Sequence, residues 1–174
     1  MRSAQCQMLD VGYMKAIQFY TIKSSGGLRV EISNLGAKIT KLLVANAKGE
    51  VKDVVLGFKT ADEWRNKETY FNAICGRVAN RIKDGQFSID GQSYQLPINN
   101  GTNSLHGGVE GFNAKVWNVT AQSAYSITLH YRSKDGEEGY PGNVDVWVTY
   151  TATSFFFKKG AMIIYYRTIR TTSH

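Results

Sequence analysis

The sequence predicts a mainly β protein, built as a β-sandwich or a barrel-like pair of sheets. Apolar and polar residues alternate in several short segments, tight-turn dipeptides occur between apolar runs, and only one segment has a convincing helical pattern. Many short strands with few helices are typical of this class. The chain has no internal repeat, low-complexity tract or linker, so a single domain is expected.

Period-two alternation marks the expected strands. Apolar side chains occupy every second position in the segments 28–33, 125–132 and 144–151. Alternation of this kind is typical of a half-buried antiparallel strand, because successive side chains point to opposite sides of the sheet. His130 falls on the polar face of the second segment, so we expect it to be exposed to solvent.

Helix and turn signals are few and local. Thr60 and Glu63 have the spacing of a capping box, which predicts a short helix near 61–67. Asp90-Gly91 separates two runs of alternating residues and can adopt the positive φ angles of a two-residue turn. The segment 87–96 is therefore expected to form a β-hairpin.

The charge balance does not support a nucleic-acid-binding face. Lys and Arg total 21 against 14 Asp and Glu, a net charge of +7, but no acidic residue follows Asp145. Part of the positive excess therefore belongs to the residues after Asp145, while the rest of the chain carries both positive and negative side chains. With 43% hydrophobic and 20% charged residues, the chain is not of the disordered class.

Cysteine and histidine spacing suggests neither a disulfide framework nor a metal site. Cys6 and Cys75 stand far apart, and His106, His130 and His174 are scattered. No secretory signal and no apolar run long enough to span a bilayer are visible. A reducing, cytoplasmic compartment is therefore expected, with no membrane partner.

The pattern changes after about Thr151. Like residues follow one another there, as in Phe155–Phe157 and Lys158-Lys159, and such runs would put apolar and charged groups on both faces of a strand. This change divides the chain into an N-terminal extension (1–16), a sandwich domain (17–151) and an aberrant or frame-shifted tail (152–174). The genomic sequence beyond His174 would test the division.

Two polar, glycine-rich stretches are candidates for a binding site, namely Gly76–Ile82 and Asn99–Gly108. Loops of this kind commonly carry binding groups, and Asn and Arg offer several directional hydrogen bonds to a polyhydroxylated ligand. The loop 135–142 adds Tyr140 as a candidate apolar platform for a sugar face. The chain has no GxGxxG motif and no P-loop, so nucleotide binding has no support.

Two motifs are the most specific part of a wider resemblance: GRVANRI at 76–82 and NSLHGG at 103–108. Further segments occur in order along the chain: Asn34–Ala37, Asp53–Phe58, Gly85–Phe87, Asp90–Leu96, Gly111-Phe112, Trp117, Gly136–Gly142 and Val148–Tyr150. Together they resemble the aldose 1-epimerase (galactose mutarotase) family over about residues 17–151. The resemblance implies a galactose mutarotase-like β-sandwich, or supersandwich. It also implies interconversion of the α and β anomers of free aldohexoses such as galactose or glucose, with no cofactor.

The implied chemistry is general acid–base ring opening. A base removes the proton of the C1 hydroxyl while an acid protonates the ring oxygen, and after rotation about C1–C2 the ring closes from the other face. By the motifs, His106 would be the catalytic residue near the ring oxygen and would also bind substrate. Arg81, with Asn80 beside it, would hold sugar hydroxyls.

The resemblance also implies residues that this sequence lacks. Family members supply, further along the chain, a second histidine as acid, an Asp for sugar hydroxyls and a Glu as base, whereas no carboxylate follows Asp145. We therefore expect an incomplete sandwich. The alternative to an epimerase is a non-catalytic carbohydrate-binding remnant or an inert fragment. An exposed sheet edge would favour self-association.

Several nearby residues have simpler structural interpretations. Without its motif, His106 would be a loop histidine bonded to backbone groups, and Arg81 a surface ion pair. Structural roles are also expected for other residues: Tyr140 packs beside Pro141, Phe112 and Trp117 belong to the core, Arg77 is structural, and Glu137 and Glu138 form a solvated turn.

Overall fold

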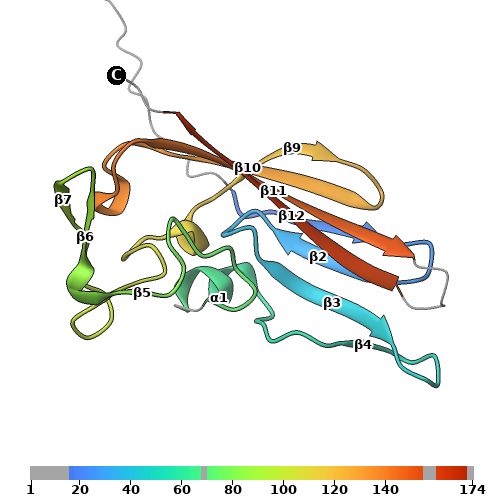
Figure 1. Cartoon of the computed structure of the whole chain (residues 1–174). Helices are drawn as coiled ribbons and strands as arrows, with labels where there is room; N and C mark the ends of the chain where they lie inside the picture. Colours follow the sequence, from blue (N-terminus) through green and yellow to red (C-terminus); the bar gives the residue numbers. More distant parts are fainter. Residues whose placement is uncertain (1–15, 68–69, 155–159, 172–174) are drawn as a thin grey trace, which may run out of the picture.

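Two antiparallel sheets of four strands each pack face to face (Figure 1). The computed structural model describes residues 16–67, 70–154 and 160–171. Expectations for Cys6, for His174, for most of the N-terminal extension and for 155–159 lie outside these residues. The predicted mainly β sandwich is confirmed.

The first sheet has the order β1-β2-β3-β4. Its strands are β1 (Phe19–Lys23), β2 (Arg29–Ser33), β3 (Ile39–Ala45) and β4 (Val51–Asp53). The strand predicted over 28–33 is β2, and it lies between β1 and β3, paired antiparallel with both. Sequential strands joined by short turns explain this simple meander.

The second sheet has the order β12-β11-β10-β9. Its strands are β9 (Asn118–Gln122), β10 (Ser126–Ser133), β11 (Asn143–Ser154) and β12 (Gly160–Thr171). The strands predicted over 125–132 and 144–151 are β10 and β11. Tyr125, expected in the strand, lies one residue before β10, in the bend that precedes it, and is 58% exposed.

Apolar residues at every second position of both sheets form the core between them. Val30 and Ile32 of β2 and Leu129 and Val148 of the second sheet are fully buried. The hydroxyl of Tyr150 crosses the core and donates a hydrogen bond of 2.6 Å to the carbonyl oxygen of Ala37. This bond satisfies the polar atom that an otherwise apolar core would leave unpaired.

A short helix and a hairpin occur where the local signals predicted them. Helix α1 (Ala61–Asn66) begins at Thr60, and both reciprocal hydrogen bonds of the capping box with Glu63 are present. Strands β6 (Gln86–Ile89) and β7 (Gln92–Gln95) pair across Asp90-Gly91, whose φ angles are 50° and 79°. Among the described residues, no helix is long and apolar enough to cross a membrane.

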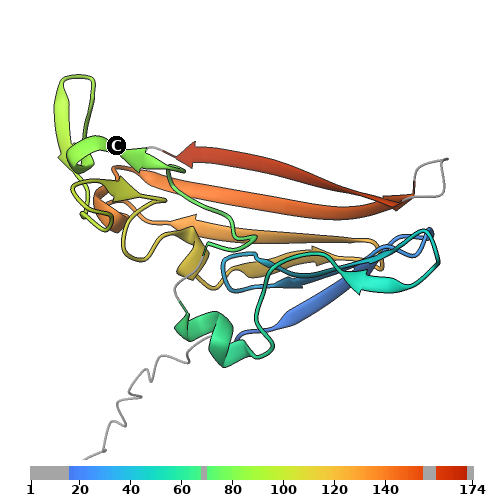
Figure 2. The same cartoon turned by 90° about the horizontal axis from the view of Figure 1, so that it is seen from below.

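Loops and short elements gather at one end of the sandwich. The short elements there are β5 (Arg81–Ile82), β8 (Ser104–Leu105), and the 3-10 turns η1 (Lys83–Gly85), η2 (Phe112–Ala114) and η3 (Glu137–Gly139). Figure 2 shows the β6–β7 hairpin projecting beyond the sheets at this end. The core residues Phe112 and Trp117, predicted as such, anchor η2 with edge-to-face rings 5.8 Å apart.

The segment after Ser154 returns to the sheet. The backbone of β12 pairs antiparallel with the whole of β11, from Ser154 opposite Gly160 to Asn143 opposite Thr171. Backbone hydrogen bonds do not depend on side-chain pattern, so loss of alternation in the sequence did not exclude a strand. The proposal of a frame-shifted tail stays a prediction.

Lys38 is a buried cation in the turn between β2 and β3. It is 3% exposed, its ammonium lies 5.8 Å from the ring centroid of Trp64, and burial lowers its pKa. Below that lowered pKa the ammonium is charged in both states, so the folded state bears the full cost of burying it. As pH rises through the lowered pKa toward 10.5, the unfolded chain holds the extra proton and stability increases.

We therefore expect Lys38→Met to raise the free energy of unfolding at pH 7 by about 1 kcal/mol. The gain should shrink as pH rises toward 10.5. Urea unfolding at pH 7 and pH 9.5 checks this, with Lys48→Met at an exposed turn as control. A gain that is absent, or equal at both pH values, would contradict the expectation.

Candidate functional site

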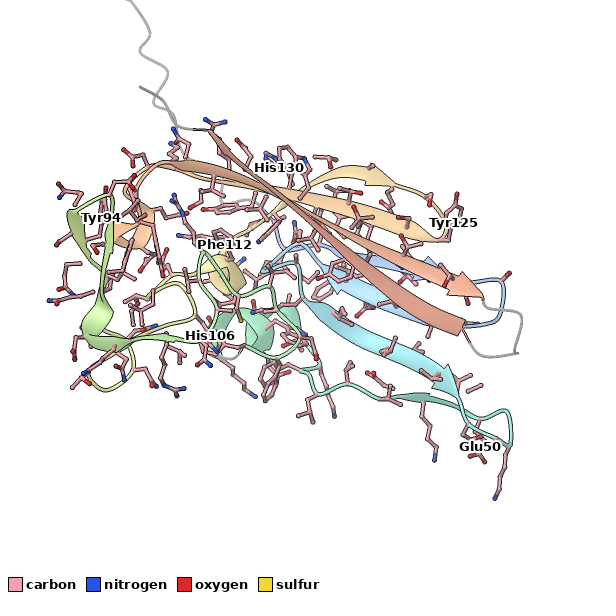
Figure 3. All side chains as sticks on the ribbon, in the orientation of Figure 1. Glu50, Tyr94, His106, Phe112, Tyr125 and His130 are labelled. Carbon is pink, nitrogen blue, oxygen red and sulfur yellow. The ribbon has the colours of Figure 1, made fainter. Side chains whose placement is uncertain are left out.

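Pairing of β5 with β8 brings the two polar stretches together. Arg81 lies opposite Leu105, so Asn80, just before β5, meets His106, just after β8. The backbone N–H of His106 donates to the carbonyl oxygen of Asn80 at 3.1 Å. Asn80, Arg81 and His106 therefore form one cluster, which we call the Arg81–His106 site, at the loop-rich end (Figure 3).

The imidazole of His106 has a defined tautomer. The backbone N–H of Asn80 donates to its Nδ1 at 2.9 Å. Since Nδ1 accepts, the proton of the neutral ring lies on Nε2. Within the described part of the chain Nε2 has no hydrogen bond, so its N–H is available to a ligand oxygen.

Arg81 is oriented by two amide side chains. Its Nε donates to Oδ1 of Asn100 at 2.9 Å, and its Nη1 donates more weakly to Oδ1 of Asn80 at 3.4 Å. The remaining guanidinium N–H groups lie on an exposed residue and can donate to hydroxyl oxygens. Both of these side-chain partners are neutral, so the described residues give no support to the simpler interpretation of Arg81 as one half of an ion pair.

Asn99 fastens the loop that carries His106. Its amide group donates to the carbonyl oxygens of Leu105 and Gly108 and accepts from the backbone N–H of Leu105, at 2.7 to 3.0 Å. One side chain thus braces both sides of His106, whose φ of 52° is unusual for a residue other than glycine. Sequence reasoning placed Asn99 and Asn100 in a binding stretch but did not separate their roles.

Tyr70 completes the surroundings of His106. Its ring centroid lies 4.5 Å from that of the imidazole, at an angle of 57°. The phenol ring therefore packs against the imidazole. No local motif marks Tyr70 in the sequence, so only the tertiary structure identifies it.

Tyr140 lies outside the Arg81–His106 site. It is 5% exposed, its ring centroid is 5.9 Å from that of Phe87, and the Arg77 guanidinium lies 5.8 Å from its ring. It borders an apolar groove of about 320 Å³ lined by Val78, Ile82, Phe87, Ile89, Val144 and their neighbours. These contacts are those of a packing residue, and its use as a sugar platform stays a prediction.

Glu137, the first residue of the turn η3, contacts side chains of the second sheet. It accepts hydrogen bonds from the hydroxyls of Tyr131 (2.5 Å) and Ser133, and its carboxylate lies 3.3 Å from the ammonium of Lys115. Burial alone would raise the pKa of Glu137, but these hydrogen bonds and the lysine outweigh it, so the pKa is lowered. Burial and the same carboxylate raise the pKa of Tyr131 well above its ordinary value.

Glu137, Glu138 and His130 are less solvated than their sequence positions predict. Glu137 and Glu138 are not a solvated turn, because both carboxylates accept several hydrogen bonds from the protein. His130 is not freely exposed, since its Nε2 lies 2.8 Å from Asp145 and its ring stacks on Trp147 at 4.6 Å. His130 thus finds its partners across neighbouring strands, whereas Glu137 finds its partners in β10 and Glu138 in a segment distant in sequence.

Arg77 is structural, as predicted. Its guanidinium donates to Oγ of Ser133 and to the carbonyl oxygens of Lys134 and Pro141, at 2.5 to 3.0 Å. It thereby ties the segment before Arg81 to the turn after β10. Among the residues for which the structure gives positions, no group of three or more His, Cys, Asp or Glu could hold a metal ion.

Comparison with known proteins agrees with this fold. A family model described as aldose 1-epimerase matches residues 18–154. Galactose mutarotase of Sus scrofa is 48% identical over 143 residues, which cover 82% of this chain and 40% of the relative. Aldose 1-epimerase of Haemophilus influenzae is 38% identical over 136 residues, covering 78% and 39%. The chain thus spans about two-fifths of the length of these relatives.

Solved structures give the same result. An aldose epimerase homologue from C. elegans superposes with a TM-score of 0.85 at 32% identity, over 90% of this chain and 47% of that one. Galactose 1-epimerase from Lactobacillus acidophilus gives 0.67 at 27% identity, over 78% and 40%. The protein is thus a galactose mutarotase-like β-sandwich. The chain belongs to the aldose 1-epimerase family, a family of isomerases.

Proposed function

We propose that the Arg81–His106 site binds the pyranose form of a free aldohexose, such as galactose or glucose, and takes part in interconverting its anomers. The observation that carries the proposal is the tautomer of His106: Nδ1 is occupied by the backbone of Asn80, so Nε2–H is left for the ring oxygen. Names of relatives, galactose mutarotase and aldose 1-epimerase, support the same substrate class.

In this proposal each side chain has one task. Nε2–H of His106 donates to the ring oxygen and supports the proton transfer that opens the ring to the aldehyde. Arg81, fixed by Asn100, donates to ring hydroxyls and orients C1. Ring closure after rotation about C1–C2 gives the other anomer, and no cofactor is needed for any of these steps.

A second candidate is sugar binding without epimerisation. Mutarotation needs a base at the C1 hydroxyl. The hydrogen-bond partners of Arg81 and His106, within the described ranges, are amides and backbone groups rather than carboxylates. This observation favours a binding module over a complete catalyst.

Polarimetry and ligand-observed NMR separate the two candidates. The full chain is added to freshly dissolved α-D-galactose and the approach to anomeric equilibrium is compared with buffer. Acceleration supports the epimerase, saturation transfer to galactose without acceleration supports the binding module, and neither signal overturns both. Mannitol, which has no anomeric centre, serves as the control ligand.

We also propose that copies of the chain associate through a sheet edge, in the cytoplasm. In the described sheet β12 is an outermost strand of twelve residues, and a long edge strand offers its free backbone groups to another chain. Sedimentation velocity over a range of concentrations should show species larger than the monomer. A single monomer boundary at all concentrations would contradict this.

A further inference from the structure

The carboxylate of Glu138 joins the turn η3 to the loop that carries His106, which we call the His106 loop. Oε2 of Glu138 accepts the backbone N–H of Val109 at 2.8 Å, and Oε1 accepts that of Glu110 at 3.1 Å. Two consecutive N–H groups bound by two oxygens of one side chain fix both the position and the direction of the backbone. The segment fixed in this way begins three residues after His106.

The missing side chain of Gly108 leaves room for this carboxylate. Its φ is +109°, and a Cβ at this position would overlap Oε2 and the side-chain carbons of Glu138. The carboxylate therefore lies directly on the backbone of the His106 loop. The side-chain amide of Asn99 donates a hydrogen bond of 2.7 Å to the carbonyl oxygen of Gly108. Gly108 is therefore fixed from two directions.

Glu138 is itself held in place. The turn that carries it is closed by hydrogen bonds between Gly136 and Tyr140 and between Tyr140 and Glu137, at 2.9 and 3.0 Å. Arg77, which lies just before Arg81 in the sequence, donates hydrogen bonds to Lys134 and Pro141, the residues on either side of this turn. Glu137 points to the second sheet while Glu138 points to the loop, so adjacent carboxylates tie the turn to two different elements.

His106 needs such support. Its left-handed backbone, with φ 52°, is uphill for a non-glycine residue and persists only where surrounding contacts determine it. In this conformation the backbone N–H of Asn80 donates to Nδ1. We infer that Glu138 is a positioning residue for His106: by binding Val109 and Glu110 it holds the loop in the one conformation that selects the Nε2–H tautomer.

The inference extends the proposed function of His106, but its first readout needs no sugar. In ¹⁵N-labelled full chain at pH 8.5, where ordinary histidines are neutral, two-bond ¹H–¹⁵N spectra report the tautomer of each imidazole. We expect wild-type His106 to show an unprotonated Nδ1 and a protonated Nε2. Glu138→Ala should move both ring nitrogens toward the average of the two tautomers.

The variants separate positioning from general stability. Glu138→Gln keeps only one of the two acceptor oxygens and should move both ring nitrogens in the same direction as Glu138→Ala, but by less. It also serves if Glu138→Ala does not fold. Glu110→Gln is the matched control, because it removes a largely exposed carboxylate from the same loop and leaves its backbone N–H bound to Glu138. A His106 signature that is unchanged in both Glu138 variants overturns the inference.

Sugar affinity is the second readout. If the wild type binds galactose, Glu138→Ala should weaken binding about tenfold, and Glu110→Gln should leave it unchanged. If the wild type binds no sugar, the proposed function fails while the tautomer result still decides the role of Glu138. A tenfold loss of affinity with an unaltered tautomer would show that Glu138 acts by another route and would overturn the inference.

Discussion

His106→Asn is expected to reduce any acceleration of galactose mutarotation by about 10²–10⁴-fold while leaving the fold intact. The asparagine amide oxygen can replace Nδ1 as acceptor for the Asn80 N–H, and asparagine tolerates a φ of 52° better than most residues. The side chain is too short to present a donor where Nε2 lies. The substitution therefore removes the proposed proton donor and keeps the hydrogen bond to the Asn80 N–H.

Polarimetry gives the rate, and urea unfolding shows whether stability is kept to within about 1 kcal/mol. His130→Gln is the control, since His130 lies on the second sheet away from the site (Figure 3). An active His106→Asn chain would contradict the assignment. His106→Ala should lose the same activity and, lacking the acceptor, also loosen the loop.

Gly107→Ala should have the largest effect on stability, about 3 kcal/mol or more. Gly107 has a φ of +94°, and an added Cβ would overlap the carbonyl group of Gly76. Neither backbone can give way easily, because Gly76 precedes the Arg77 anchor and Gly107 follows His106. Sugar binding should be lost together with stability, since the same overlap separates the two halves of the site.

Gly101→Ala is the matched control for this prediction. Gly101 has a φ of +61° but no atom within 4 Å of an added Cβ. It therefore carries only the conformational penalty of the left-handed region, about 1 kcal/mol. Urea unfolding of both variants measures the difference, and equal losses would show that the contact with Gly76 contributes nothing.

Local patterns predicted the fold well. Alternation over 28–33 and 144–151, the capping box at Thr60 and the turn at Asp90-Gly91 each specify a conformation within a few residues, and the structure confirms them. The strand β12 was missed as a regular element. Its backbone pairs along the whole of β11, which a side-chain pattern does not report.

The site was predictable only as far as its motifs reach. Arg81 and His106 stand in recognisable stretches, and the pairing of β5 with β8 explains their meeting. The roles of Tyr70 and Glu138 depend on contacts between segments distant in sequence, such as Glu138 with Val109, 29 residues apart. No periodicity or spacing encodes such contacts, which is why the sequence predicts Glu138 only as part of a solvated turn.

The anchoring of Arg77 has a consequence for the order of events during synthesis. Its partners at Ser133 and Pro141 lie 56 and 64 residues further along the chain. Contacts of such wide separation form late, because closing the intervening loop costs entropy before any bond repays it. A nascent chain that has left the ribosome only as far as the NSLHGG stretch would already display Arg81 and His106, yet their geometry would await the arrival of β10 and the turn behind it.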